Sequence, residues 1–348
     1  MAILPSPRLK HVDDQTGLTV FQYDKMAPGR TFHDVVVVKA SFDLTSEGIN
    51  PASSPAPLSL ADTHRNEDDP TGSSLVRAGD LIMGKPGADI YVTGAARNPR
   101  PSKHWLVGVT LGPMDKPLLR YECVVTGPHR WQHSILKGWH SSPPELTQAV
   151  PIQYELAYGG RAPSPPEPPE QWERSGTNPS GSGYSMAAYS ITDTPPAPQW
   201  EPATAFGSSR SKELVGLGPV ARFWASRQQY AGTYDEAWLR QFKEEAIPDY
   251  PADFDSRFFQ CAHPQLQTRA PLRGDEALCL VGLLAEKTRL ETRLPGLAIV
   301  ANAKNGTARL PLDTVHIDLD AQQVHLVWHL TLPQTLDIEQ LNLSLEKL

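Results

Sequence analysis

Four carboxylates in the last third of the chain have the residue type that acid–base catalysis requires. They are Asp253, Asp255, Asp275 and Glu276. A pair of carboxyl groups performs glycoside hydrolysis, one as the acid and the other as the base or nucleophile. Arg257 and Arg273 stand nearby in the sequence as ion-pair partners, and Asp is also a common turn former. We therefore favour charge-paired loop junctions here, and keep a carboxylate-dependent hydrolase using the Asp253 to Glu276 region as the alternative.

Histidine and cysteine give weaker indications of chemistry. Two histidine pairs have a spacing of four, in segments that look extended, where four residues span about 13 Å and cannot share a zinc ion with bonds of about 2 Å. The pairs are His129 with His133 and His325 with His329. Cys261 stands two residues before His263, which is not how a catalytic Cys and His are brought together. The Gly-rich run 180–185 lacks the Lys of a phosphate-binding loop. We expect no catalytic residue, no metal site and no cofactor.

Aromatic side chains are concentrated in the same part of the chain. Residues 222–259 hold ten of the 27 Phe, Trp and Tyr residues, interleaved with arginines. Aromatic and Arg side chains dominate the energetics of protein interfaces, although aromatics also fill ordinary cores. We expect a conformationally constrained interaction surface within residues 222–276. The expected partner-binding side chains are Trp224, Arg227, Tyr234, Trp238, Phe258, Phe259 and Arg273.

A helix is predicted to begin at Thr233 and to end before Pro248. Thr233 and Glu236 have the spacing of a capping box, in which each side chain satisfies a backbone N–H of the first turn. Trp238 and Phe242 then share one apolar face. The acidic residues around this helix are therefore assigned a structural role. With the cap itself, the structural set is Thr233, Asp235, Glu236, Asp253, Asp255 and Asp275.

The elements that must position these residues are mostly strands. Short segments rich in β-branched and aromatic residues recur between Gly, Pro and Asn turn signals. They cover residues 31–44, 89–93, 104–111, 118–125, 130–136, 151–158, 277–284, 288–294, 297–301, 314–319, 323–330 and 338–345. This pattern predicts a mainly β protein with sandwich- or barrel-like sheets and few short helices.

Proline divides this pattern. The chain has 34 prolines, about twice the ~5% average, and eleven of them fall between Gly159 and Pro219. Because proline lacks an N–H donor and fixes φ, this Pro/Gly/Ser-rich stretch cannot hold long helices or central strands. It is either an ordered loop that clamps a partner or a mobile connection. We therefore expect one module, 1–348, with a β-rich half 1–158, an irregular segment 159–218 and a second half 219–348.

Charge and targeting signals narrow the class of protein. The net charge of −7 is spread along the 348 residues without a basic face, which argues against nucleic acid or an anionic membrane as partner. The N-terminal residues lack the apolar core of a secretory signal, and no stretch approaches the ~20 apolar residues of a transmembrane helix. Three cysteines without metal-like spacing favour reduced thiols. We expect a cytoplasmic protein.

Several motifs, in their order and spacing, resemble a known bacterial family. They are KPGADI at 85–90, YGG at 158–160, NPSGSGY at 178–184, VARFW at 220–224, GTYDEAWL at 232–239, DFD at 253–255 and LRGDE at 272–276. The chain resembles, over nearly its whole length, the uncharacterised-domain family encoded beside VgrG spike and toxin genes in type VI secretion loci. The resemblance implies a non-catalytic adaptor or chaperone that binds a toxic effector and loads it onto the C-terminal region of the VgrG spike. Residues 262–267, AHPQLQ, depart from the expected motif, which would bear on which effector is recognised.

Overall fold

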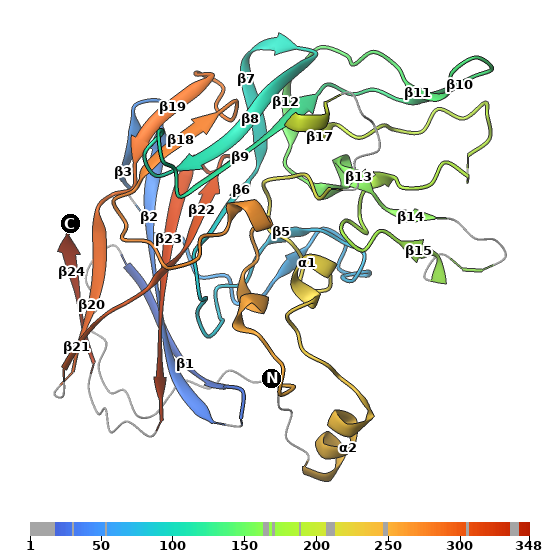
Figure 1. The fold of residues 1–348 in the computed structure, drawn as a ribbon. Coiled ribbons are helices and arrows are strands. Elements are labelled where there is room, and N and C mark those ends of the chain that lie inside the picture. The colour runs from blue at the N-terminus through green and yellow to red at the C-terminus, as the bar shows by residue number, and fades with distance from the viewer. Residues whose placement is uncertain are drawn as a thin grey trace.

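The computed structural model describes ten stretches of the chain: residues 18–29, 31–52, 54–162, 167–168, 171–187, 189–206, 213–245, 250–303, 306–334 and 341–348. Its largest element is a six-stranded sheet that joins the two ends of the sequence (Figure 1). Along the sheet the strands are β1 (Leu18–Met26), β2 (Phe32–Thr45), β23 (Gln323–Pro333), β22 (Leu312–Asp318) and β6 (Asp89–Thr93), and β3 (Gly48–Pro51) also pairs with β2. Every pair is antiparallel except β22 with β6.

A five-stranded antiparallel sheet packs against it. Its order is β17 (Trp200–Pro202), β9 (Leu119–Thr126), β8 (His104–Leu111), β18 (Ala277–Val281) and β19 (Arg289–Arg293). One continuous apolar core includes alternate residues of β2 and β8, such as Val36, Val38, Val107 and Val109. The described strands therefore form open, sandwich-like layers, and the prediction of a mainly β protein with few short helices is confirmed.

The remaining elements are small. The third sheet has the order β21 (Gly306–Arg309), β20 (Leu297–Ala303) and β24 (Asn342–Lys347). The two-stranded sheets are β4 (Thr63–His64) with β5 (Leu75–Arg77), β7 (Ala95–Ser102) with β12 (Thr147–Pro151), β10 (Trp131–Ser134) with β11 (Gly138–Ser141), β13 (Tyr158–Gly159) with β16 (Ser182–Gly183), and β14 (Arg161–Ala162) with β15 (Glu173–Arg174). The helices are α1 (Ala225–Gln228) and α2 (Glu236–Glu245), with single 3₁₀ turns η1 (Tyr154–Leu156), η3 (Ala203–Ala205), η4 (Ser256–Phe259) and η5 (Pro264–Leu266). None of the helices described is long and apolar enough to cross a bilayer.

The described part of the Pro/Gly-rich segment is packed rather than detached. Asn178 is fully buried and donates its side-chain amide to the carbonyls of Tyr154 and Tyr158, at 2.8 and 3.1 Å. Trp200, 1% exposed, donates its indole N–H to the carbonyl of Pro151. Prolines 163, 165, 166 and 169 lie outside the described residues. Whether the segment clamps a partner stays a prediction.

The second face of the large sheet carries buried polar groups. His316 stacks on Tyr91 with ring centroids 4.6 Å apart, and lies 5.2 Å from the ring of His325. The Nδ1 atom of His325 lies 3.0 Å from the hydroxyl of Ser41. Burial lowers the pKa of His316 well below its usual value and that of His325 to about 4. These two imidazoles are therefore neutral at pH 7.

Candidate functional site

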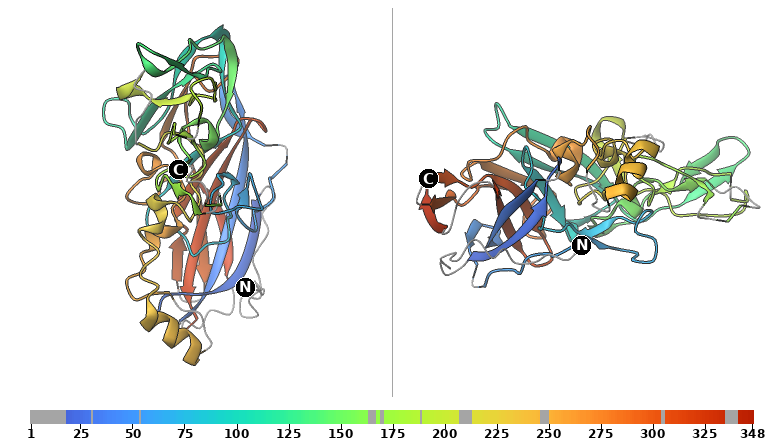
Figure 2. Two further views of the ribbon diagram at one scale, coloured as in Figure 1. Left: turned by 90° about the vertical axis from the view of Figure 1, so that its right-hand side faces the viewer. Right: turned by 90° about the horizontal axis from the view of Figure 1, so that it is seen from below.

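The aromatic region 222–259 divides into an anchored part and a projecting part. Figure 1 shows α1 beside the body of the molecule, while α2 lies at one end, apart from both large sheets, and the side view in Figure 2 agrees. The anchored part consists of α1 with η4, and the projecting part consists of α2 with the segments that lead to it. The two parts contain the same residue types, but the structure gives them different environments.

Trp224 belongs to the anchored part. Its side chain is fully buried, and its ring meets that of Tyr154 edge-on at 5.1 Å, within the main apolar core. The prediction that Trp224 contacts a partner is therefore wrong, because the ring has no surface left to offer. Phe259, 8% exposed, is corrected for the same reason.

Arg227 is buried and joins two segments of the chain by hydrogen bonds. Its guanidinium donates to the carbonyl of Phe258 through Nε and Nη2, at 3.0 and 2.9 Å, and to the carbonyl of Val220 through Nη1, at 2.9 Å. Only 4% of the residue is exposed. A guanidinium whose donors are committed in this way holds η4 against α1, so its predicted role in binding a partner is also wrong. Phe258 itself is half-buried beneath this guanidinium.

The projecting part stands on a two-chain stalk, residues 230–235 going out and 250–255 coming back. Asp253 closes the stalk by accepting from the backbone N–H of Thr233 at 2.9 Å and from its hydroxyl at 2.7 Å. Lower down, the N–H of Asp255 donates to the carbonyl of Tyr230 at 3.0 Å. Gly232 has φ +81, and a Cβ there would lie 2.8 Å from Pro251, so glycine lets the two chains approach. Asp253 and Asp255, which were assigned structural roles, thus make contacts in the stalk.

Helix α2 begins later than the sequence predicts. Asp235 is the residue that caps it: its carboxylate accepts from the N–H of Trp238 at 2.8 Å, and its carbonyl accepts from Leu239. The predicted capping box of Thr233 with Glu236 is wrong, because the Thr233 hydroxyl is bound to Asp253 instead. Glu236 is the first helical residue, where its charge suits the helix dipole.

One face of this projecting part carries a row of aromatic rings, which we call the aromatic strip: Tyr234, Trp238 and Phe242. The Tyr234 and Trp238 rings meet edge-on at 4.7 Å, and the Trp238 and Phe242 rings stack at 5.4 Å. Tyr234 is 55% exposed, and Trp238 and Phe242 are half-buried. Leu239, 42% exposed, extends the apolar surface. The predicted apolar helix face therefore exists, but it is presented to solvent rather than to the core.

A second group of rings continues the apolar surface at the returning side of the stalk. Tyr250 and Phe254 lie 4.2 Å apart, and Phe254 and Phe258 lie 5.8 Å apart. Burial, and then the neighbouring Tyr234 hydroxyl, raise the pKa of Tyr250. The hydrogen bonds between Thr233 and Asp253 bring the segment of Tyr234 beside the segment of Phe254, so the strip and this second group lie at the same part of the stalk.

The carboxylates considered for hydrolysis are bonded within the protein. Asp255 pairs with Arg257, Asp275 pairs with Arg273 at 3.4 Å, and the oxygens of Glu276 accept from the backbone N–H groups of residues 273 and 274. Asp275 and Glu276 directly precede β18, which Figure 1 places far from α2 along the molecule. Arg273, predicted to bind a partner, has a 73% exposed side chain and lies away from the aromatic strip.

Motifs far apart in the sequence meet inside the fold. Lys85 and Asp89 form a buried ion pair at 2.7 Å, and Asp89 also accepts from the N–H of Cys261 at 2.6 Å. Gly159, at φ +149, lies so close to Asn178 that a Cβ would stand 2.1 Å from the Asn178 carbonyl oxygen. These motif residues maintain the packing of the core.

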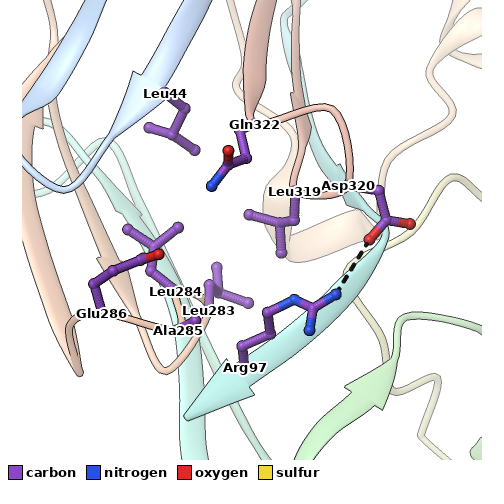
Figure 3. A pocket seen from close by; sticks show the side chains of 9 residues that line it. All are labelled: Leu44, Arg97, Leu283, Leu284, Ala285, Glu286, Leu319, Asp320 and Gln322. Atoms are coloured by element: carbon purple, nitrogen blue, oxygen red, sulfur yellow. Dashed lines mark ion pairs between the residues drawn. The ribbon is translucent and has the colours of Figure 1, made fainter. Parts of the chain in front are cut away.

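One concave feature lies elsewhere on the molecule. Figure 3 shows a half-open hollow of about 250 Å³ whose apolar walls include Leu44, Leu284 and Leu319. Arg97 and Asp320 form an ion pair at 3.8 Å at its edge. A specific small-molecule site needs polar groups that converge on one point, and the hollow has few such groups. The aromatic surface around α2 is thus the stronger candidate for function.

Comparison with curated proteins and with solved structures finds no match to the chain. A family model does match, over residues 29–329, and so covers most of the sequence. Its description names no secretion system, so the expected association with type VI loci stays a prediction. The chain belongs to this family, the uncharacterised proteins conserved in bacteria designated DUF2169.

Proposed function

We propose that this protein is a non-catalytic adaptor that binds another protein through the aromatic strip of α2. The observation that carries the proposal is the position of the strip: the exposed Tyr234 and the half-buried Trp238 and Phe242 lie on and beside a helix that a clamped stalk holds away from the body. Amphipathic helices commonly bind by laying anchors at i and i+4 into an apolar groove of their partner. Trp238 and Phe242 have this spacing within α2, and Tyr234 precedes the helix and meets the ring of Trp238 edge-on.

The size of the surface sets what else the partner must contact. An aromatic side chain buries about 150–250 Å² at most, so three supply no more than about 750 Å², and these three supply less because Trp238 and Phe242 are already half-buried. A stable interface covers about 800 Å² on each partner. The second group of rings, Tyr250, Phe254 and Phe258, adjoins the strip and would supply the remainder.

The family resemblance indicates which kind of partner the adaptor would bind. It makes the partner a toxic effector, which the adaptor binds in the cytoplasm and loads onto the VgrG spike. Two observations favour this role over the hydrolase alternative. The four candidate carboxylates are engaged by Thr233, by arginines or by backbone N–H groups. They also lie in two separate parts of the fold rather than facing one another.

Co-expression with the proteins encoded on either side of the gene tests the proposal. We expect one of them to co-purify with the wild-type chain, and Trp238→Ala with Phe242→Ala to abolish the complex. Phe206→Ala is the matched control, since Phe206 is 45% exposed and lies against His104, away from the strip. No complex at micromolar concentration and low salt, with either neighbouring protein, would refute the adaptor.

A further inference from the structure

A second projecting element lies at the opposite end of the molecule from α2. Strands β10 and β11 pair antiparallel from Trp131 with Ser141 to Ser134 with Gly138. They extend beyond the five-stranded sheet as a separate hairpin in Figures 1 and 2. We call residues 130–142 the finger, and its tip is the turn Ile135-Leu136-Lys137.

The residue types at the tip are unusual for a turn. Ile135 is fully exposed and Leu136 is 96% exposed, the highest values among the described large apolar residues. Gly138, at φ +63, provides the left-handed residue that ends a three-residue hairpin loop. Such loops favour Gly, Asn, Asp and Ser, and two branched aliphatic side chains in water contribute nothing to folding. Positions that break a local rule without a structural gain are those where function is expected.

The base of the finger is rigid, so the tip is held in place. Trp131 is 1% exposed, and its backbone N–H donates to the carbonyl of Pro195 at 2.8 Å. Arg130 donates through Nη1 to the carbonyl of Thr194 at 2.9 Å. Higher up, the directly paired rings of His133 and Trp139 meet edge-on at 5.4 Å. A preorganised tip loses little conformational entropy when it binds.

Charge indicates what the tip binds. Residues 127–144 contain Arg130 and Lys137 but no Asp or Glu, in a chain that has 39 acidic residues and a net charge of −7. This local excess of positive charge complements an acidic surface. A membrane is the poorer match, because two aliphatic side chains anchor weakly and the chain as a whole is repelled by anionic lipid.

We propose that the finger is a second docking element, which inserts Ile135 and Leu136 into an apolar pocket, rimmed by carboxylates, on a protein partner. This inference rests on the proposed adaptor function and deepens it. The finger and the aromatic strip lie at opposite ends of the molecule, so each binds a different protein and the adaptor holds the two together.

A single fluorescent label at the tip tests this directly. Cys123, Cys261 and Cys279 are all buried, so Leu136→Cys supplies one accessible thiol for an environment-sensitive dye such as bimane. Leu118→Cys is the matched control: Leu118 is 58% exposed and precedes β9, whose eight residues separate it from the finger by about 25 Å. The probes are the purified proteins encoded on either side of the gene.

We expect the emission of the label at 136, and not at 118, to shift to the blue with one of these two proteins. That shift should persist when the strip carries Trp238→Ala with Phe242→Ala. Replacing both tip residues, Ile135→Ser with Leu136→Ser, should weaken binding of the same protein by at least about 50-fold, because each aliphatic anchor accounts for about tenfold. Lys137→Glu should weaken it as well, since the rim of the pocket is acidic.

Each other result would overturn the inference. A shift on vesicles that contain phosphatidylserine would make the finger a membrane anchor, and a shift that depends only on the concentration of the labelled chain would make it a self-association element. If the strip still binds a partner but the tip label never shifts, the finger is inert and the adaptor function stands. If the wild-type chain binds neither protein, both proposals fail.

Discussion

Asp253 holds Thr233 by two hydrogen bonds across 20 residues of sequence, accepting from its backbone N–H at 2.9 Å and from its hydroxyl at 2.7 Å. This contact closes the stalk that carries α2. It explains why a Gly-Thr-Tyr-Asp motif at 232–235 and an Asp-Phe-Asp motif at 253–255 occur in one chain: each supplies half of the clamp. The position of the aromatic strip depends on it.

Removing the clamp should impair binding rather than folding. Asp253→Ala removes both acceptors, so the stalk loses its fixed geometry and the affinity for the effector should fall about tenfold. The melting temperature should change little, because the Asp253 side chain is exposed and the main core does not depend on it. Isothermal titration and differential scanning calorimetry measure the two quantities. A large fall in melting temperature would instead make the clamp part of the folded core.

Replacement by alanine should reduce stability at Trp224 and partner affinity at Trp238, although the two residues are only fourteen positions apart. Trp224→Ala removes a fully buried ring and should cost about 3–5 kcal/mol of stability. Trp238→Ala removes a half-buried ring that contacts Tyr234 and Phe242 of its own strip, so the melting temperature should stay nearly unchanged while the affinity falls at least about 30-fold. Thermal unfolding and titration with the partner check both variants. Equal loss of stability in the two would show that the strip is core.

How far the sequence predicted this structure depends on the range of the interactions. Strands 89–93 and 104–111 were predicted to the residue, because β-branched and aromatic side chains favour an extended backbone whichever strand lies beside it. The cap of α2 was misplaced, because Thr233 and Asp235 are equally good caps locally and a bond from Asp253 decides between them. The different fates of Trp224 and Trp238 depend on tertiary contacts that no local pattern reports.

The finger shows the same limit. The aliphatic side chains of residues 130–136 predicted one strand, but β10 ends at Ser134 and Ile135 and Leu136 form the turn. The only local signal was Gly138, whose positive φ ends the turn. The buried pair of Lys85 with Asp89 was likewise missed as a contact, although the residues that form it lie in a recognised motif.

Replacing one partner of the buried ion pair between Lys85 and Asp89 should destabilise the folded protein. Lys85→Met leaves the fully buried Asp89 carboxylate without its cation, and the free energy of unfolding should fall by about 3–5 kcal/mol. The double variant with Asp89→Leu should recover part of this loss, because no unpaired charge then remains. Urea denaturation of the two single variants and the double variant gives the coupling. Strictly additive effects would contradict a direct interaction between the two charges.

Stability should decline in mild acid because of buried histidines. His263 stacks on Tyr121 at 4.3 Å, its Nδ1 accepts from the N–H of Gln265, and burial lowers its pKa to about 4. The unfolded chain therefore binds more protons than the folded protein, so stability is complete above about pH 6.5 and is lost as the pH falls toward 4. At pH 5 His263 alone should cost about 2 kcal/mol relative to pH 7.5.

The matched variant for this pH dependence is His263→Gln, which removes the titrating group. Its free energy of unfolding, measured with urea at several pH values, should fall less between pH 7.5 and 5 than that of the wild type. His316 and His325, whose pKa values are also lowered by burial, account for a residual slope. Identical slopes in the wild type and the variant would mean that folding does not shift the pKa of His263, which would contradict the effect of burial.

The central claim is that α2 docks a protein partner, and a titration of the neighbouring effector into three forms of the chain tests it most directly. The forms are the wild type, the strip variant Trp238→Ala with Phe242→Ala, and the control Phe206→Ala. We predict tight binding by the wild type and the control, and a loss of at least about 100-fold in the strip variant with its melting temperature preserved. Undiminished binding by the strip variant, or no binding by the wild type, would contradict the account.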